Sequence, residues 1–282
     1  MKSYLILAKN LLVLLTLINC QSKKEDTTNE TDERVVIAPT YQDILDSAKL
    51  NGAVLIYDSQ QETFYTNDSV WMKTGFLPAS TFKIANSINA LENGIAKDTN
   101  TMFFWDGKPK FLKSWEEDMN FFQAYQRSCV PCYQHIARQT GVNKMRETLD
   151  KIDYPGMVFD STSIDNFWLE GASRISQIEQ ITFLKRLFNK KLPLTENTYA
   201  VMEQIMLLKE TPNYKLYGKT GWAQPDDVTN IGWFVGYAKT ADNVFFIATN
   251  VQPGQGFDMQ DFGKVRMGVS LDALQPHIEK TL

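Results

Sequence analysis

The chain has 282 residues, of which 43% are hydrophobic and 22% charged, and its formal net charge is −4. This is ordinary globular composition, enough for one large domain or two small ones. A slightly acidic chain with no long Lys/Arg stripe argues against a nucleic-acid partner. Two histidines, His135 and His277, are too few for three histidine zinc ligands and make a Ser-His-Asp hydrolase hard to build.

Residues 1–19 have the outline of a signal peptide: basic residues precede an apolar run at 11–18 that is too short to span a bilayer comfortably. The run ends in Leu-Ile-Asn-Cys, which resembles the lipobox of bacterial lipoproteins and implies a lipid on Cys20; plain secretion with a nearby cleavage is the alternative. Residues 20–34 are polar and read as a flexible tether. We therefore expect an exported protein, periplasmic or anchored to the outer membrane, with one folded domain over 35–282.

The first part of that domain predicts a helix, a hairpin and a second helix. Residues 41–50 space their apolar side chains like an amphipathic helix, and the apolar runs 52–58 and 62–68 flank a polar turn. Residues 80–94 predict a helix that Pro78 precedes and Gly94 ends.

Helical patterns follow around 133–150, 176–190 and 195–209, and then the pattern changes. Strand-like runs occupy 214–222, 230–239 and 243–251, and residues 263–282 predict a closing helix. Strands at both ends without βαβ alternation indicate an α+β fold. We expect an antiparallel sheet built from both chain ends and flanked by helices, with a mostly helical region, about 95–210, inserted between them.

Ser80 and Lys83 lie three residues apart at the expected start of a helix, in Ser-Thr-Phe-Lys. That spacing puts both side chains on one face, where a neutral, buried lysine could activate the serine as a nucleophile. Free N–H groups at a helix start favour an oxyanion nearby. The simpler interpretation is a serine N-cap with a solvated lysine, because Ser-x-x-Lys is common by chance.

Lys-Thr-Gly occurs twice, at 73–75 in a loop and at 219–221 on a strand-like run. A cation and a hydroxyl on a strand beside the nucleophile could hold a substrate carboxylate, and a glycine allows close approach to the backbone. Chain order favours Lys219, and Lys73 is expected to be an ordinary loop residue.

Ser128 begins the stretch Ser-Cys-Val-Pro-Cys, 128–132. A serine near a lysine can relay a proton to a leaving amine. Cys129 and Cys132 could instead form a redox pair, or a metal site with His135, but the βαβ context of the first and a fourth ligand for the second are missing. We expect them to be bystanders, with their redox state left open.

Four motifs in order, Ser-Thr-Phe-Lys, Ser-x-Val, Trp-Leu-Glu-Gly at 168–171 and the second Lys-Thr-Gly, resemble the class D serine β-lactamases, the oxacillinase family. The resemblance extends from about residue 40 to the C-terminus. Ser87-Ile88-Asn89 has the Ser-x-Asn form of penicillin-binding proteins, but it falls in the same expected helix as Ser80.

The resemblance implies a role for each matching residue. The acylated nucleophile is Ser80, the general base is Lys83 carbamylated by carbon dioxide, and the proton relay is Ser128. The residues implied to support the carbamate are Val130, Trp168 and Leu169. Those implied to bind substrate are Lys219, Thr220, Gly221, Trp222 and Arg266, with the backbone N–H groups of Ser80 and Trp222 forming the oxyanion hole.

The resemblance further implies hydrolysis of β-lactam antibiotics through an acyl-enzyme, with no metal and no cofactor beyond the carbon dioxide on Lys83. The only partners implied are a small-molecule substrate and, through Cys20, a membrane. One stretch departs from the family: Tyr154-Pro155-Gly156 stands where Tyr-Gly-Asn is usual, which bears on loop geometry and substrate preference.

Two other functions stay open. A β-lactam sensor domain would acylate without turnover, although such receptors carry several membrane spans and this chain has a single apolar run. A cell-wall transpeptidase or carboxypeptidase is the other, against which Ser-x-Val in place of Ser-x-Asn argues.

Overall fold

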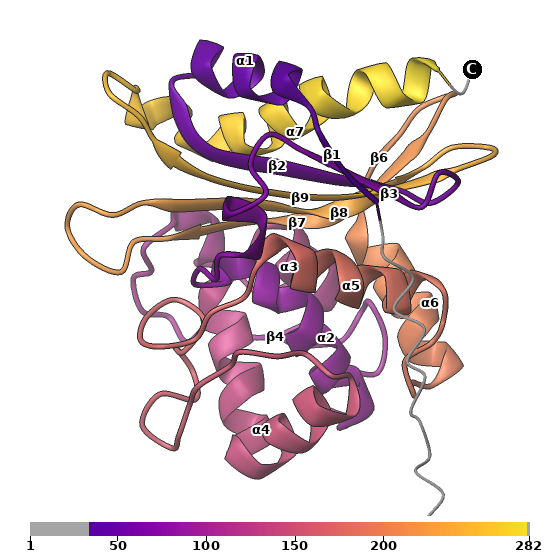
Figure 1. Cartoon of the computed structure of the whole chain (residues 1–282). Coiled ribbons are helices and arrows are strands. Elements are labelled where there is room, and N and C mark those ends of the chain that lie inside the picture. The colour runs from indigo at the N-terminus through magenta and orange to yellow at the C-terminus, as the bar shows by residue number, and fades with distance from the viewer. Residues whose placement is uncertain (1–33, 281–282) are drawn as a thin grey trace, which may run out of the picture. The chain divides into compact units, whose positions relative to one another are not determined.

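A computed structural model describes residues 34–280, which lie in one compact unit, and the expected signal peptide and most of the tether lie outside them (Figure 1). The strands are β1 (Arg34–Ile37), β2 (Leu50–Asp58), β3 (Thr63–Thr66), β4 (Met102–Phe103), β5 (Met119–Asn120), β6 (Leu207–Glu210), β7 (Lys215–Ala223), β8 (Ile231–Lys239) and β9 (Val244–Pro253).

The described residues form a seven-stranded sheet in the order β1-β3-β2-β9-β8-β7-β6, and β4 pairs with β5 in a separate small ribbon. The centre of the large sheet joins β2 from one end of the chain to β9 from the other, as expected. One expectation is wrong in part: β1 pairs with β3 in parallel, so the sheet is mixed. Helix α1 (Pro39–Ser47) lies between β1 and β2 in the chain and places β1 on the far side of the β2–β3 hairpin.

The other helices are α2 (Lys83–Glu92), α3 (Phe121–Gln126), α4 (Val130–Lys151), α5 (Gln177–Phe188), α6 (Glu196–Met206) and α7 (Phe262–Glu279), with short 3-10 turns η1 (Trp71–Lys73), η2 (Ala79–Phe82), η3 (Lys113–Trp115) and η4 (Met259–Asp261). Figure 1 shows α1 and α7 on one face of the sheet and the helices from α2 to α6 on the other. Among the described helices, none is long and apolar enough to cross a membrane.

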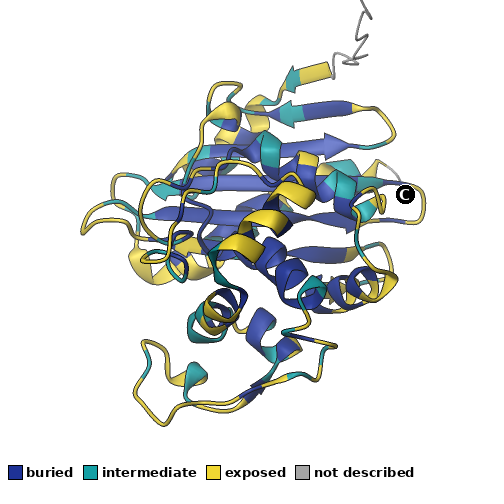
Figure 2. Ribbon diagram, turned by 90° about the horizontal axis from the view of Figure 1, so that it is seen from below, coloured by how far each residue is buried: buried dark blue, intermediate teal, exposed yellow. Residues whose placement is uncertain are grey.

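Burial explains why the central strands read as continuous apolar runs. All of β8 except its last residue, Lys239, is buried, and Figure 2 shows the middle of the sheet in the colour of buried residues. The cause is that helices cover both faces of the sheet (Figure 1). One hydrophobic core lies between the sheet and α1 and α7, and a larger one lies on the side of the inserted helical region. The larger core is the one that contains the site.

Candidate active site

Ser80 lies in the turn η2, directly before α2. The turn depends on an unusual backbone conformation at Ala79. Ala79 has a φ of 52°, in the left-handed region that a residue with a Cβ seldom adopts. Its N–H donates to the carbonyl oxygen of Trp168 at 2.8 Å. Thr81 is fixed as well, since its hydroxyl donates to the carbonyl oxygen of Pro78 at 2.5 Å. The expected helix therefore starts at Lys83, three residues later than its sequence pattern indicates.

Lys83 and Ser80 are in direct contact. The Nζ of Lys83 donates to the Oγ of Ser80 at 3.0 Å, and only 1% of the lysine is exposed. Burial, and secondly the positive charge of Lys219, holds the pKa of Lys83 well below its usual range. A lysine that is neutral and touches the serine hydroxyl can accept its proton, so this geometry suits a nucleophile and its base.

The wall beside this pair is aromatic. Phe82 stacks on Trp168 with ring centroids 5.5 Å apart, and Phe167 meets Trp168 edge to face at 5.1 Å. Trp168 is fully buried, yet its Nε1 has no hydrogen-bond partner among the described residues. A buried N–H without an acceptor is costly. Leu169 is partly buried and packs against this core, and Val130 is partly buried.

Strand β7 carries the second Lys-Thr-Gly against the nucleophile turn. Gly221 leaves room for η2, because a Cβ there would lie 3.1 Å from Thr81 and 3.2 Å from Ala79. Lys219 is buried, and burial together with the charge of Arg266 lowers the pKa of Lys219 to about 7. Thr220, the middle residue of the triplet, is partly buried.

Arg266 reaches the same strand from α7. Its guanidinium donates to the carbonyl oxygen of Gly221, and its Nε donates to that of Phe262 at 2.8 Å. It lies over the ring of Trp222, 5.5 Å from the centroid. Burial lowers its pKa to about 10, so Arg266 stays charged at neutral pH. Arg266, and Lys219 when it is protonated, therefore present positive charge along the second half of β7, which favours an anionic ligand.

Ser128 lies in the link between α3 and α4, and a tyrosine on each side of it contacts one of the two lysines. Tyr125, three residues earlier, donates its hydroxyl to the carbonyl oxygen of Gly218 at 3.1 Å and lies under Lys219, with its ring 5.8 Å from Nζ. Tyr133, five residues later, has its ring 5.0 Å from the Nζ of Lys83. Ser128 has a φ of 54° and is partly buried.

The sequence matches the penicillin binding protein transpeptidase domain over residues 47–270. It is 39% identical over 203 residues to "Beta-lactamase OXA-48" of Klebsiella pneumoniae, and the alignment covers 72% of this chain and 76% of that protein. Among solved structures, a class D β-lactamase from Nostoc aligns with a TM-score of 0.79 at 37% identity, over 83% of this chain and 97% of that one. The chain belongs to the class D β-lactamase family. The C-terminal domain of the Bacillus licheniformis BlaR penicillin receptor is also similar, with a TM-score of 0.80 at 27% identity over 86% of this chain and 96% of that one.

Within this class D β-lactamase, the two Lys-Thr-Gly triplets lie in different environments. Lys73, at the end of η1, is exposed to solvent, whereas Lys219 is buried beside the nucleophile turn. Ser87 and Asn89 are part of a buried polar network between α2 and α4: Ser87 pairs with the hydroxyl of Tyr133 at 2.7 Å, and Asn89 donates to Thr140 at 2.7 Å.

The stretch that departs from the family packs tightly against its neighbours at Gly156. Gly156 has a φ of 76°, and a Cβ there would lie 1.8 Å from the carbonyl oxygen of Arg174. The Gly156 carbonyl oxygen accepts the N–H of Arg174 at 2.8 Å. Tyr154 is buried and donates its hydroxyl to Gln180 at 3.4 Å. Gly156 is therefore the position where this loop packs against its neighbour.

The two cysteines are bonded to each other, with their Cα atoms 5.4 Å apart. A disulfide cannot supply two thiolate ligands, so the metal alternative for Cys129, Cys132 and His135 loses its donors. His277 lies on the other side of the sheet, where the hydroxyl of Tyr41 contacts its Nε2 at 2.6 Å.

Sequence reasoning missed Tyr125 and Tyr133, whose rings contact the two lysines. Their signal was helical spacing: Tyr125 precedes Ser128 by one turn, and Tyr133 follows Val130 by one turn.

Proposed function

We propose that this chain is exported and hydrolyses β-lactam antibiotics through an acyl-enzyme on Ser80, with Lys83 carbamylated by carbon dioxide. The observation that carries the proposal is the buried contact between the Nζ of Lys83 and the Oγ of Ser80 at 3.0 Å. Family membership supports the substrate class, since "Beta-lactamase OXA-48" is similar over most of its length.

The residues around Lys83 fit a carbamate. Carbon dioxide reacts with the neutral amine, which burial of Lys83 favours. A carbamate is an anion and needs a hydrogen-bond donor in a dry pocket, and the Nε1 of Trp168 is a buried donor without an acceptor among the described residues. When carbon dioxide is bound there, it supplies an anionic base in place of the amine.

The rest of the reaction follows from the chain's own groups. Ser80 gives up its proton toward Lys83 and attacks the strained lactam carbonyl, while the backbone N–H groups of Ser80 and Trp222 hold the oxyanion. Ser128 passes a proton to the ring nitrogen as the amide bond breaks. Lys219 and Arg266 hold the substrate carboxylate. Water then attacks the acyl carbonyl, and Ser80 is released.

Export is supported by the disulfide between Cys129 and Cys132, because such bonds persist in oxidising compartments outside the cytoplasm. We place the protein in the periplasm or on the outer membrane, held there by a lipid on Cys20. That residue lies outside the part of the chain that the structure describes.

A sensor function is the second candidate, because the BlaR penicillin-receptor domain has the same fold. Steady-state turnover of a chromogenic cephalosporin separates the two. We expect many turnovers per Ser80, and none in a Ser80→Ala variant. A single burst equal to the enzyme concentration, followed by a stable acyl-enzyme in mass spectrometry, would instead identify a sensor or a transpeptidase.

A further inference from the structure

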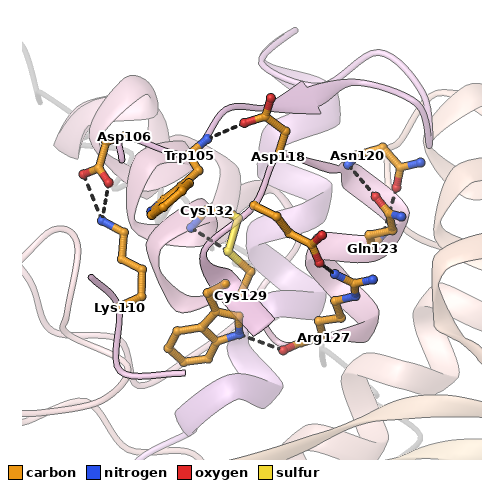
Figure 3. Close-up of a disulfide and its surroundings, with 11 residues drawn as sticks. Trp105, Asp106, Lys110, Asp118, Asn120, Gln123, Arg127, Cys129 and Cys132 are labelled. Carbon is orange, nitrogen blue, oxygen red and sulfur yellow. Dashed lines mark hydrogen bonds and ion pairs between the residues drawn. A yellow bond between two sulfur atoms is a disulfide. The ribbon is translucent and has the colours of Figure 1, made fainter. Parts of the chain in front are cut away.

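The disulfide lies at the first turn of α4, directly after Ser128 (Figure 3). Cys129 is the N-cap residue of this helix, and its Sγ accepts the backbone N–H of Cys132 at 3.2 Å. The two sulfurs differ in access, because Cys129 is 1% exposed whereas Cys132 is partly exposed. A reagent from solvent therefore reaches Cys132 first.

Ser128 is held from both sides. Before it, the carbonyl oxygen of Arg127 accepts the indole N–H of Trp115 at 3.0 Å, and its guanidinium forms an ion pair with Glu117. After it, the disulfide ties Cys129 to the first turn of α4. The φ of 54° at Ser128 is unfavourable for a residue with a side chain, so it persists because its neighbours impose it. One of those constraints is a bond that thiols can break.

A pocket of about 560 Å³ opens beside the disulfide. Both cysteines line it, together with the aromatic rings of Phe103 and Trp105 and the cationic Arg138. Figure 3 shows Trp105 and the Lys110–Asp106 ion pair close to the disulfide. A pocket of this size admits a small molecule and excludes a folded protein.

We propose that the Cys129–Cys132 disulfide is a thiol-reducible clamp on Ser128, opened by a low-molecular-weight thiol that occupies this pocket. The inference rests on the proposed function, because Ser128 affects turnover only as the proton relay. It also changes the expectation that the cysteines are bystanders: they stay outside the chemistry but position a residue that takes part in it.

The exchange is balanced in two steps. A thiolate, RS⁻, attacks the Sγ of Cys132; the protein S–S bond breaks, a mixed disulfide forms on Cys132, and Cys129 leaves as a thiolate. The N–H of Cys132 and the start of α4 stabilise that leaving group, which then takes up a proton. A second thiolate attacks the outer sulfur, forming RSSR and freeing Cys132. Two thiols are oxidised to one disulfide, and one protein disulfide is reduced to two thiols.

The difference in access is tested without measuring activity. In the full chain carrying Cys20→Ser, the matched variants Cys129→Ala and Cys132→Ala each leave one thiol at this place. We expect 5,5′-dithiobis(2-nitrobenzoate) to label Cys132 at least tenfold faster than Cys129 in the folded protein. Equal rates, or faster labelling of Cys129, would overturn the assignment of Cys132 as the point of attack.

The clamp is tested by turnover before and after treatment with dithiothreitol, with reduction confirmed by mass after alkylation. We expect kcat to fall about threefold to tenfold with KM changed by less than about twofold, and diamide to restore it. A Cys129→Val/Cys132→Val variant keeps apolar volume without the bond. We expect its kcat to equal that of the reduced enzyme and to be unchanged by dithiothreitol. All forms are assayed well below the melting temperature of the reduced protein.

Three results contradict the inference: a disulfide that dithiothreitol leaves intact in the folded enzyme, an unchanged kcat after complete reduction, or a valine variant as active as the oxidised enzyme. If the oxidised enzyme itself hydrolyses no β-lactam, the proposed function fails instead. In that case the mass after dithiothreitol and alkylation would still show whether the folded protein's disulfide is reducible.

Discussion

The backbone N–H of Ala79 and the carbonyl oxygen of Trp168 are joined by a hydrogen bond of 2.8 Å. This bond fastens the turn that presents Ser80 to the aromatic wall beside Lys83. Phe82 adds a ring stack on Trp168 from the same turn. A substitution of Trp168 therefore disturbs both the nucleophile's position and the hydrogen-bond donor next to the base, and an informative variant must keep the ring.

We expect activity to depend on bicarbonate. Enzyme that is degassed at mildly acidic pH should lose turnover and regain it on addition of bicarbonate, because protonation of Lys83 competes with its carbamylation. Trp168→Phe keeps an aromatic ring and removes the N–H, so it should need more bicarbonate for the same rate. Lys83→Ala should lose about 10³-fold or more in turnover. Carbon-13 NMR with labelled bicarbonate reads the adduct directly, and activity indifferent to bicarbonate at every pH, with no adduct, would leave a bare lysine as the base.

The two Lys-Thr-Gly triplets offer a matched pair of variants. Lys219→Ala should raise KM for a carboxylate-bearing β-lactam and lower kcat, because a buried cation beside the nucleophile is lost. Lys73→Ala should change kcat/KM by less than about twofold, since Lys73 is exposed. Equal damage from both substitutions in steady-state kinetics would mean that the substrate lies elsewhere.

The lowered pKa of Lys219 predicts the alkaline limb of the pH profile. Its pKa is about 7, so the free enzyme loses this cation as the pH rises through 7, and kcat/KM should fall there. The charge of Arg266 is one cause of the lowered pKa. Arg266→Ala should therefore weaken binding and also move the limb to higher pH. A limb that stays in place in that variant would belong to another group.

The same shift affects stability with a definite sign. Between pH 7 and 10.5 the unfolded chain holds a proton on Lys219 that the folded protein has lost, so this residue makes stability rise with pH in that window. Lys219→Met should flatten the slope. Urea unfolding at several pH values measures it, and a slope that the substitution leaves unchanged would argue against a lysine buried in this way.

Alanine substitutions at Gly156 and Gly107 distinguish the cost of a steric clash from the cost of backbone strain. Both have φ near 75°, but a Cβ at Gly156 would lie 1.8 Å from a carbonyl oxygen, whereas nothing lies within 4 Å at Gly107. Gly107→Ala should cost about 1–2 kcal/mol from strain alone. Gly156→Ala should cost clearly more, because backbone must move. Thermal melting compares the two variants. Equal decreases in melting temperature would show that the loop at Gly156 moves to relieve the clash at no cost in stability.

Lipidation of Cys20 is expected from the apolar run that ends at this residue and the polar stretch that follows. Mass spectrometry of the mature N-terminus from native membranes should find a lipid-modified Cys20, and Cys20→Ala should release the protein in soluble form. A free N-terminus downstream of Cys20 would contradict the expectation.

Local patterns predicted most of the fold. The hairpin β2–β3, the apolar strands β7 to β9 and helices α1, α5 and α7 follow directly from periodicity and turn residues. The parallel pairing of β1 did not, because four residues before Pro39 carry too little pattern to show a partner strand. The helix expected to reach residue 209 ends at Met206, where the chain turns into the edge strand β6. Sheet pairing, which is a tertiary effect, decided the structure of residues 207–209.

In the site, the sequence pointed to residues that lie together in the structure, but it did not show which contacts hold them there. Ser80, Lys83 and Lys219 were found from motif order, and the structure brings them together. The left-handed backbone at Ala79 and Ser128 was not predictable, because neither alanine nor serine favours it and the cause lies in distant partners such as Trp168 and Trp115. The redox state of Cys129 and Cys132 could not be predicted either, since a spacing of three residues does not specify a bond.

The pairing of β2 with β9 joins Leu50 to Pro253 and Asp58 to Phe245, partners that lie about 200 residues apart in the chain. The ribosome completes β9 only when most of the chain has been made, so β2 cannot pair with β9 until synthesis is nearly finished. Contacts of such long range close slowly, because the loop entropy is lost before the strands pair. If the proposed export takes the chain out of the cytoplasm unfolded, this delay favours it. It also means that no N-terminal fragment assembles the site, because Lys219 and Ser80 meet only when the sheet closes.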